Sequence, residues 1–353
     1  MCIKTGNLIL QFIIKKIVTK KLYFKLNFDT IFLYKKIVGV IFVDIRDFID
    51  NIKYEHANRL RYGGKFPLKY LIAIVAVCVV LIIGIVVLIV NLSKEPTKVL
   101  TTELTESLGY NLAKEYYKFS DKKSEKYFSI ENIDDAYNSL IEGKCDVIIS
   151  PLPGDEVITR LNNENIEIEK YIISRDAFVF LNNSKNPVTG LKSEDIKKIY
   201  SKAITNWSEL GGEDLDILAY QSKSGETLYY AFKKYMGDYT LEKPKIRLQD
   251  ESLNGLINAI TNYLDTRKSA IGYTNYNALK NTELPDNCRV LKVDGEKVDD
   301  VKIFMDEYPA TFDIYVIVRK DAMKSSQVKK LVEYILSEKG QDVIRESGYI
   351  VAK

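Results

Sequence analysis

The stretch NPVTGLKSEDIKKIYSKAITNWSELGG, from Asn186 to Gly212, carries the clearest local pattern of the chain. A helix is expected to begin near Ser193, a residue type suited to an N-cap, and Glu194 and Asp195 follow in its first turn. Carboxylates at this end of a helix are favoured by the partial positive charge of its exposed N–H groups. The stretch therefore predicts a helix that leads into a turn packed on Trp207 and a Gly-Gly corner.

Short apolar runs on both sides of this stretch predict strands. They are DVIIS (Asp146 to Ser150), DAFVFLN (Asp176 to Asn182), LDILAY (Leu215 to Tyr220), SAIGYTNY (Ser269 to Tyr276) and FDIYVIV (Phe312 to Val318). Amphipathic segments lie between them, and one carries apolar residues from Leu228 to Tyr235 at the spacing of a single buried helix face. The alternation predicts an α/β protein with largely parallel sheets.

The stretch from Asn186 to Gly212 is similar to a segment of the phosphate-binding proteins of ABC importers. The similarity continues in the same order through SKSGETLYYAF, SAIGYTNY, YPATFDIYVIVRK and EKGQDVIRESGYIVAK, and so covers most of residues 99–353. The resemblance implies a periplasmic-binding-protein-like fold of type II, with two lobes joined by a hinge and a ligand in the cleft between them. It places lobe 1 at about 99–178 and 285–353 and lobe 2 at about 179–284.

The resemblance also implies a ligand turn in lobe 2. In the family, a Gly-Ser-Gly-Thr turn opens a helix and grips phosphate with hydroxyls and backbone amides, as helix N-termini can. Here the turn reads KSGE: Ser224 and Gly225 match, Lys223 replaces a glycine and Glu226 replaces the threonine, while Thr227 supplies the next hydroxyl. Ser224, Gly225 and Thr227 are the implied ligand residues, and Lys223 and Glu226 are candidates.

In lobe 1 the resemblance assigns ligand roles to two further groups. One is the pair Thr101 and Thr102 in the segment TTELT, and the other is Ser150 at the end of DVIIS. The family's arginine falls at about Tyr220, which makes Tyr220 a candidate contact but removes the bidentate clamp that a guanidinium gives an oxyanion. The ligand site is therefore expected to diverge from that of the family.

The negative charge of Glu226 affects whether the predicted site can hold phosphate. Two like unit charges 4 Å apart repel by about 1 kcal/mol in water and about 4 kcal/mol at an effective dielectric constant of 20. A carboxylate facing the cleft would therefore oppose phosphate, whereas one lying outside would only complement its helix N-terminus.

The resemblance implies a solute-binding protein that delivers phosphate or a related oxyanion to an ABC importer. The alternative is a degenerate binding domain that acts as a surface sensor or interaction module without transport.

The segment from Tyr70 to Val90 contains 21 residues without a charge. As a helix it would be about 31 Å long, which matches the hydrocarbon core of a bilayer. We expect a transmembrane helix over 70–92, followed by a linker over 93–98. The apolar run is too long for a cleaved signal peptide. A lipoprotein signal would need its cysteine at the end of the run, and Cys78 lies in the middle of it.

Charge is distributed unevenly on the two sides of this segment. Residues 1–69 carry 14 Lys or Arg and 5 Asp or Glu, whereas residues 70–353 carry 37 and 43. The basic side is expected to be cytoplasmic, so the protein would be a single-pass protein of the cell membrane with residues 99–353 outside the cytoplasm. Residues 1–69 form a cytoplasmic tail, an interfacial segment, or sequence upstream of the true start. Residues 70–353 are mildly acidic and therefore a poor candidate for nucleic-acid binding, because contacts to phosphates need a basic face.

Composition excludes several kinds of site. One histidine, His56, and four scattered cysteines are too few for a Cys/His zinc site or for histidine-dependent catalysis. We expect no cofactor and no enzymatic activity. A disulfide between Cys145 and Cys288 is chemically allowed outside the cytoplasm and stays open. Arg175, at the expected crossing between the lobes, is expected to form a hinge salt bridge.

Overall fold

The computed structural model describes residues 96–245, 247–248, 250, 252–261 and 268–352, together with five single residues before position 96. Apart from those single residues, the basic head (1–69) and the apolar segment from Tyr70 to Val90 lie outside the described part. None of the helices that are described is long and apolar enough to cross a bilayer. The transmembrane helix therefore stays a prediction.

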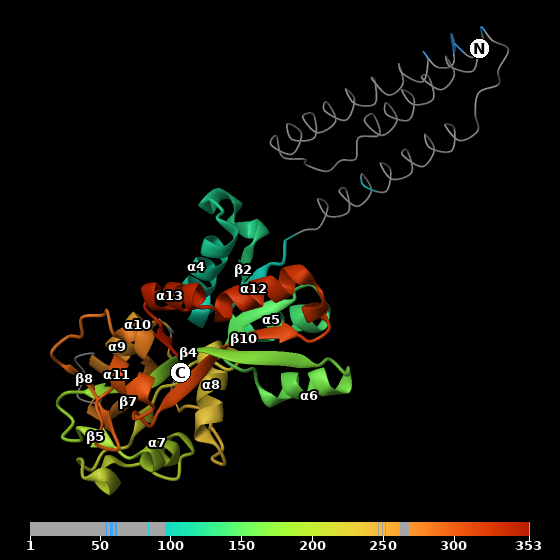
Figure 1. Cartoon of the computed structure of the whole chain (residues 1–353). Helices are drawn as coiled ribbons and strands as arrows, with labels where there is room; N and C mark the ends of the chain where they lie inside the picture. Colours follow the sequence, from blue (N-terminus) through green and yellow to red (C-terminus); the bar gives the residue numbers. More distant parts are fainter. Residues whose placement is uncertain are drawn as a thin grey trace. The chain divides into compact units, whose positions relative to one another are not determined.

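The long strand β4 (Ile168–Asn183) belongs to two groups of elements, which we call lobe 1 and lobe 2 (Figure 1). The other elements of lobe 1 are β1 (Val99–Thr101), η1 (Glu103–Thr105), α4 (Glu106–Tyr117), η2 (Asp121–Lys126), β2 (Phe128–Ile130), α5 (Ile133–Ile141), β3 (Val147–Ser150), α6 (Asp155–Asn163), β10 (Thr311–Arg319), η5 (Ala322–Lys324), α12 (Ser326–Leu336), α13 (Glu338–Glu346) and β11 (Ile350–Val351).

Lobe 2 contains the elements between the two crossings. They are β5 (Gly190–Leu191), α7 (Ser193–Tyr200), η3 (Trp207–Leu210), β6 (Leu218–Ala219), α8 (Thr227–Met236), α9 (Leu253–Thr261), β7 (Ala270–Asn275), α10 (Tyr276–Leu279), β8 (Cys288–Val290), β9 (Lys292–Val293) and α11 (Asp300–Met305).

Each lobe is a sheet with a core on both faces. In lobe 1, Val147 and Ile149 of β3 pack with residues of α4, α12 and α13, whereas Ile148 between them packs with residues of α5 and α6. In lobe 2, Phe180 of β4 packs with α7, α8 and α11, and its neighbour Val179 packs with α9. Successive side chains of a strand point to opposite faces, so these apolar runs bury both faces of each sheet.

The expectation of largely parallel sheets was wrong, because the sheets are mixed. Strands β1, β2 and β3 pair in parallel, and so do β6 and β7. Strand β10 is antiparallel to both β3 and β4, and β7 is antiparallel to β4. The physical reason is that β4 carries the chain out of lobe 1 and β10 carries it back, so the two crossing strands run side by side in opposite directions.

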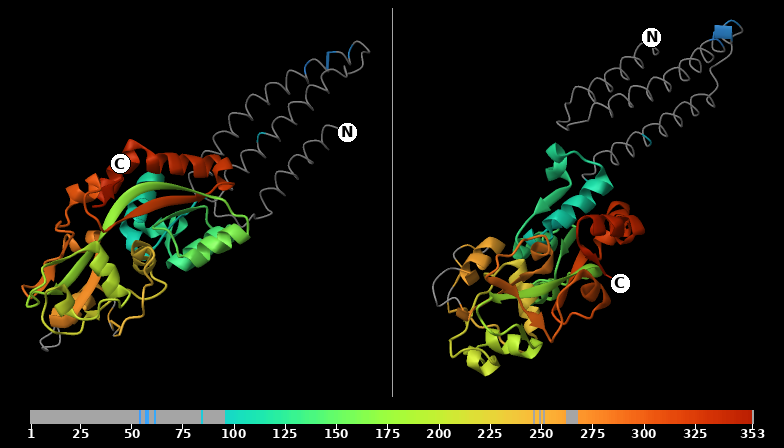
Figure 2. Two further views of the ribbon diagram at one scale, coloured as in Figure 1. Left: turned by 90° about the horizontal axis from the view of Figure 1, so that it is seen from below. Right: turned by 90° about the vertical axis from the view of Figure 1, so that its left-hand side faces the viewer.

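The crossing strand β4 is longer than the expected run Asp176 to Asn182. Its first half, from Ile168 to Ala177, pairs with β10, and its second half pairs with β7 and β8 (Figure 2, left). Ile303, Tyr308 and Ala310 still lie in the core around Phe180. The return to lobe 1 therefore occurs at β10, later than the boundary of about 285 that the sequence indicated.

The crossing is reinforced by charge, as predicted for Arg175. Its guanidinium lies 2.9 Å from the carboxylate of Asp306 and 2.9 Å from that of Asp313 on β10. The neighbouring Asp176 is buried and accepts hydrogen bonds from the N–H of Ala177 and from Asn275. Burial raises the pKa of Asp176, and these hydrogen bonds oppose the rise.

Two further predictions concern Trp207 and the pair of cysteines. Trp207 is fully buried and its Nε1 donates to the carbonyl of Ser269 over 2.9 Å, which confirms its packing role. Cys145 and Cys288 are free thiols buried in different cores, so the disulfide that was left open does not form. Burial raises the pKa of Cys145 to about 12 and that of Cys288 to about 11.

Candidate functional site

The ends of two neighbouring strands and the start of α8 meet at one place. Thr101 ends β1 and Ser150 ends β3, and the parallel register pairs Thr101 with Ile149. From lobe 2, the backbone N–H of Thr227 donates to the carboxylate oxygen Oε1 of Glu103 over 2.9 Å. The structure thus brings predicted ligand residues of both lobes together, around the carboxyl ends of parallel strands where open α/β sheets bind ligands.

On the lobe 1 side, the predicted hydroxyls are buried and already hydrogen-bonded. Oγ1 of Thr101 lies 2.6 Å from Oγ1 of Thr105 and 3.0 Å from the carbonyl oxygen of Ile149. Oγ1 of Thr102 lies 3.3 Å from that of Thr105. Ser150 donates its hydroxyl to the carbonyl of Pro151 over 2.7 Å. This cluster is bonded within lobe 1.

On the lobe 2 side, the predicted ligand turn is more open. The N–H of Glu226 donates to the carbonyl of Lys223 over 3.2 Å and closes a four-residue turn. Gly225 has a φ of +100° there, a backbone conformation that other residues adopt only with strain. Lys223 and Ser224 are exposed and Gly225 and Glu226 are half-buried. The turn leads directly into α8, which begins at Thr227.

The helix that follows this turn begins with an unpartnered hydroxyl. Thr227, the first residue of α8, is fully buried, and its Oγ1 has no hydrogen-bond partner among the described residues. Glu226 occupies the N-cap without a side-chain capping bond, and the first turn of α8 contains no acidic residue. The amide and hydroxyl of Thr227 therefore form a pair of groups suited to an anion, with Glu103 on the amide.

Tyr230, one turn further along α8, also reaches lobe 1. Its hydroxyl donates to Oδ2 of Asp134, in the first turn of α5, over 3.0 Å. Its ring covers Gly154, the N-cap of α6, so closely that a Cβ there would lie 2.5 Å from a ring carbon. Burial, and then the hydrogen bond to Asp134, raise the pKa of Tyr230 to about 12.

Glu103, Asp134 and Gly154 were missed by the analysis of the sequence. Glu103 carries the one charge in TTELT, and that isolated charge beside predicted ligand residues was a usable signal. The roles of Asp134, Gly154 and Tyr230 depend on contacts between lobes, and no local pattern announces these.

Tyr220, the candidate in the place of the family's arginine, is a core residue. It is 2% exposed and packs with Leu256 and Ile260. Its carbonyl accepts a hydrogen bond from the hydroxyl of Tyr200 over 3.1 Å. The structure therefore gives Tyr220 a packing role.

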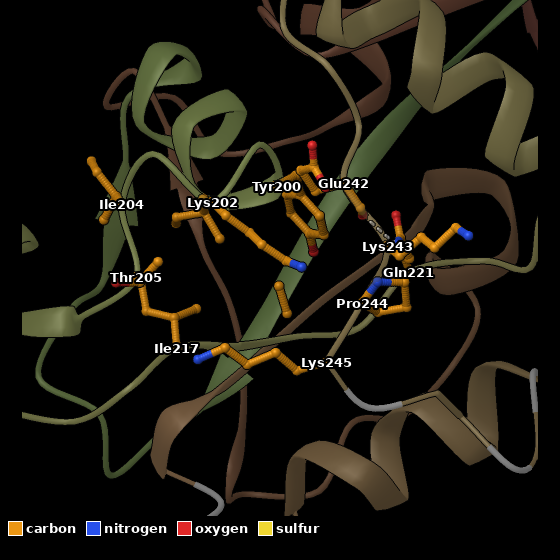
Figure 3. Close-up of a pocket in the computed structure, with 12 residues that line it drawn as sticks. Tyr200, Lys202, Ile204, Thr205, Ile217, Gln221, Glu242, Lys243, Pro244 and Lys245 are labelled. Atoms are coloured by element: carbon orange, nitrogen blue, oxygen red, sulfur yellow. Dashed lines mark hydrogen bonds between the residues drawn. The ribbon is translucent and has the colours of Figure 1, made fainter.

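A separate pocket lies in lobe 2, between the end of α7, β6 and residues 242–245 (Figure 3). Gln221 donates from its side-chain nitrogen to the carbonyl of Glu242 over 2.9 Å, and its side-chain oxygen is buried without a partner among the described residues (Figure 3). Lys245 lines this pocket and lies 3.4 Å from the carboxylate of Asp216. The predicted ligand residues do not appear in its lining.

Known proteins resemble this chain in sequence over its body. Residues 134–339, more than half of the chain, match the PBP superfamily domain. The phosphate-binding protein PstS of Bacillus subtilis (strain 168) is 26% identical over 201 residues, which are 56% of this chain and 63% of that protein. PstS of Borreliella burgdorferi is 23% identical over 198 residues, 55% of this chain and 70% of that protein. The match thus spans less than two thirds of the first of these relatives.

Solved structures resemble the fold. An ABC-type phosphate transport receptor from Vibrio cholerae has a TM-score of 0.56 at 18% identity, and the match covers 72% of this chain and 99% of that one. A putative phosphate ABC transporter substrate-binding protein with bound phosphate, from Clostridium perfringens, has a TM-score of 0.53 at 21% identity over the same shares. At these identities the likeness supports the two-lobed architecture.

Proposed function

Because this chain belongs to the family of PBP superfamily domains, we propose that its residues 99–353 form an extracytoplasmic solute-binding domain for phosphate or a related oxyanion. The domain would deliver this ligand to the permease of an ABC importer. The relatives named as phosphate-binding proteins and phosphate transport receptors support this choice of ligand and partner. No chemical step is part of the proposal.

The start of α8 is the observation that carries the proposal. Its first residue, Thr227, has a buried hydroxyl without a partner among the described residues, and a buried hydroxyl left unpaired is costly. The amide of Thr227 donates to Glu103, so an oxyanion that displaced this carboxylate would accept from both the amide and the hydroxyl. Ser224 and Gly225 of the preceding turn would add donors, and Lys223 would add a point charge.

The lobe 1 side would close over the same ligand. Thr101, Thr102 and Ser150 lie at the strand ends beside η1, from which Glu103 reaches the start of α8. Movement about the crossing strands β4 and β10 would open the cleft for exchange with solvent. In this proposal the lobe 1 hydroxyls act mainly by shaping the wall, because their hydrogen bonds are made within lobe 1.

Isothermal calorimetry of the purified full chain in detergent, with inorganic phosphate at two salt concentrations, tests the proposal. Micromolar or tighter binding is expected, and it should weaken at the higher salt concentration because salt screens the attraction of the anion. The absence of any heat with phosphate, sulfate or another oxyanion would contradict it.

A second candidate function keeps the fold without transport. Two carboxylates, those of Glu103 and Glu226, lie at the start of α8, and Tyr220 stands where the family has an arginine. These features favour a degenerate binding domain that serves as a surface sensor or interaction module. Co-purification separates the two: a permease and ATPase should accompany the chain if it serves an importer.

We also propose that the segment from Tyr70 to Val90 anchors this domain to the cell membrane as a single-pass helix, with residues 1–69 in the cytoplasm. The length of the uncharged run and the excess of basic residues before it support this arrangement. The chain should stay in the membrane pellet after an alkaline carbonate wash. Protease added outside cells stripped of their wall should remove residues 99–353. Protection of these residues would show that they lie in the cytoplasm, opposite to the proposed orientation.

A further inference from the structure

One carboxylate of the chain already holds the amide that the proposed ligand would use. Glu103 belongs to lobe 1, Thr227 begins α8 of lobe 2, and the two are joined by an N–H to carboxylate hydrogen bond of 2.9 Å. A carboxylate at a helix N-terminus is attracted both by the N–H groups and by the partial positive charge of that end. The contact therefore draws the lobes together.

Both residues of this contact lie on elements that are held by buried residues of their own lobe. Glu103 stands between Thr102 and Thr105, which are fully buried, and the N–H of Thr105 donates to the carbonyl of Thr102 over 3.0 Å. On the other side, α8 is anchored in the lobe 2 core by Ala231 and Phe232. Because both elements are fixed in their own lobes, loss of this hydrogen bond should change the distance between lobe 1 and lobe 2.

The side chain of Glu103 is nevertheless accessible. Glu103 is an exposed residue, in contrast to the buried threonines that flank it. A dissolved anion can therefore reach this carboxylate, and it gains the amide of the buried Thr227 when the lobes separate at this contact, without unfolding of either lobe. The hydroxyl of Thr227, which the carboxylate leaves without a described partner, would give the competing anion an additional donor.

We propose that Glu103 is a built-in competitor for the anion site: its carboxylate holds the N-terminus of α8 and latches the lobes together, and an incoming anion must displace it. The latching part stands on the observed contact alone. The competition part rests on the proposed function, since it requires that an oxyanion binds at Thr227.

Glu103→Ala in the full chain tests both parts, and Glu106→Ala is the matched control. Glu106 is an exposed carboxylate three residues further along, in the first turn of α4, so the control removes the same charge from the same lobe. Spin labels attached through K122C in lobe 1 and D238C in lobe 2, both exposed positions, report the distance between the lobes. Cys2 and Cys78 are replaced by serine, and Cys145 and Cys288 are buried.

Without added phosphate, the label distance should lengthen or broaden in E103A and stay at the wild-type value in E106A. An unchanged distance in E103A overturns the proposal. With phosphate, E103A should bind at least about fivefold more tightly than the wild type, the factor produced by one unit charge repelling another across ~4 Å of water.

A lower phosphate affinity in E103A would make Glu103 a ligand group and overturn the competition. If neither the wild type nor E103A binds phosphate, the proposed function fails, but the label distance still decides whether Glu103 latches the lobes. The two failures are therefore distinguishable.

Discussion

The two sides of the cleft are built in opposite ways. In lobe 1, the hydroxyls of Thr101, Thr105 and Ser150 are fully buried and bond to each other or to carbonyls of the same lobe. In lobe 2, the hydroxyl of Thr227 is equally buried but has no partner among the described residues, and the turn before it is partly open to solvent. Residues of the same type thus stabilise the fold on one side and remain available for a ligand on the other.

The largest expected effect is a loss of stability on the lobe 1 side. Thr101→Val keeps the side-chain volume but removes a hydroxyl that bridges Thr105 and the carbonyl of Ile149. Breaking buried hydrogen bonds in this way should lower the free energy of unfolding by about 1–3 kcal/mol. Urea unfolding followed by far-UV circular dichroism measures it, and a variant as stable as the wild type would show that the cluster contributes nothing.

The same substitution on the lobe 2 side should act on binding instead. Thr227→Val removes a buried hydroxyl that has no described partner, so the free energy of unfolding should stay equal or rise slightly. The affinity for phosphate should fall about tenfold, the worth of one hydrogen bond to a charged ligand. A loss of stability as large as that of Thr101→Val would remove the contrast between the two sides.

A third change examines the turn that presents Thr227. Gly225 has a φ of +100° and open space around the position of a Cβ, so Gly225→Ala should cost about 1 kcal/mol through backbone strain alone. Gly211, with a φ of +79° and similar open space, is the matched control in another turn of lobe 2. Both variants should lose similar stability by urea unfolding, but only Gly225→Ala should weaken phosphate binding in calorimetry. If Gly225→Ala and Gly211→Ala bind phosphate equally well, the turn at Gly225 is not part of the ligand site.

The core strands could be predicted from the sequence because a strand buried on both faces is a continuous apolar run. DVIIS and FDIYVIV match β3 and β10 closely. By contrast, β4 begins at Ile168, eight residues before the predicted run, because Glu169 and Lys170 interrupt the apolar pattern there. Those residues are nevertheless paired with β10, and pairing between strands far apart in the sequence is not encoded in local hydropathy.

The resemblance named candidate residues that lie near one another in the structure, but it did not show which of them are already hydrogen-bonded. The similar segments included the turn before α8, and TTELT at the end of β1 was assigned separately; η1, which follows β1, contacts the start of α8. The hydroxyl of Thr101, for example, is satisfied by partners 4 and 48 residues away, Thr105 and Ile149. The carboxylate of Glu103 reaches Thr227 across 124 positions of sequence, so a search for matching ligand residues passed it over.

The smallest expected effect concerns Glu226, the residue that replaces the family's threonine in the lobe 2 turn. It occupies the N-cap of α8 without a capping bond from its side chain, beside the amide of Thr227. Glu226→Thr should therefore raise the phosphate affinity by about fivefold, because it removes one like charge at a solvated position. Calorimetry at low and high salt distinguishes this from a structural change, since an electrostatic gain should shrink as salt screens the removed repulsion. An affinity that does not change at either salt concentration would mean that the carboxylate complements the helix from outside the cleft, and the divergence of the ligand site would then rest on Glu103 and Tyr220.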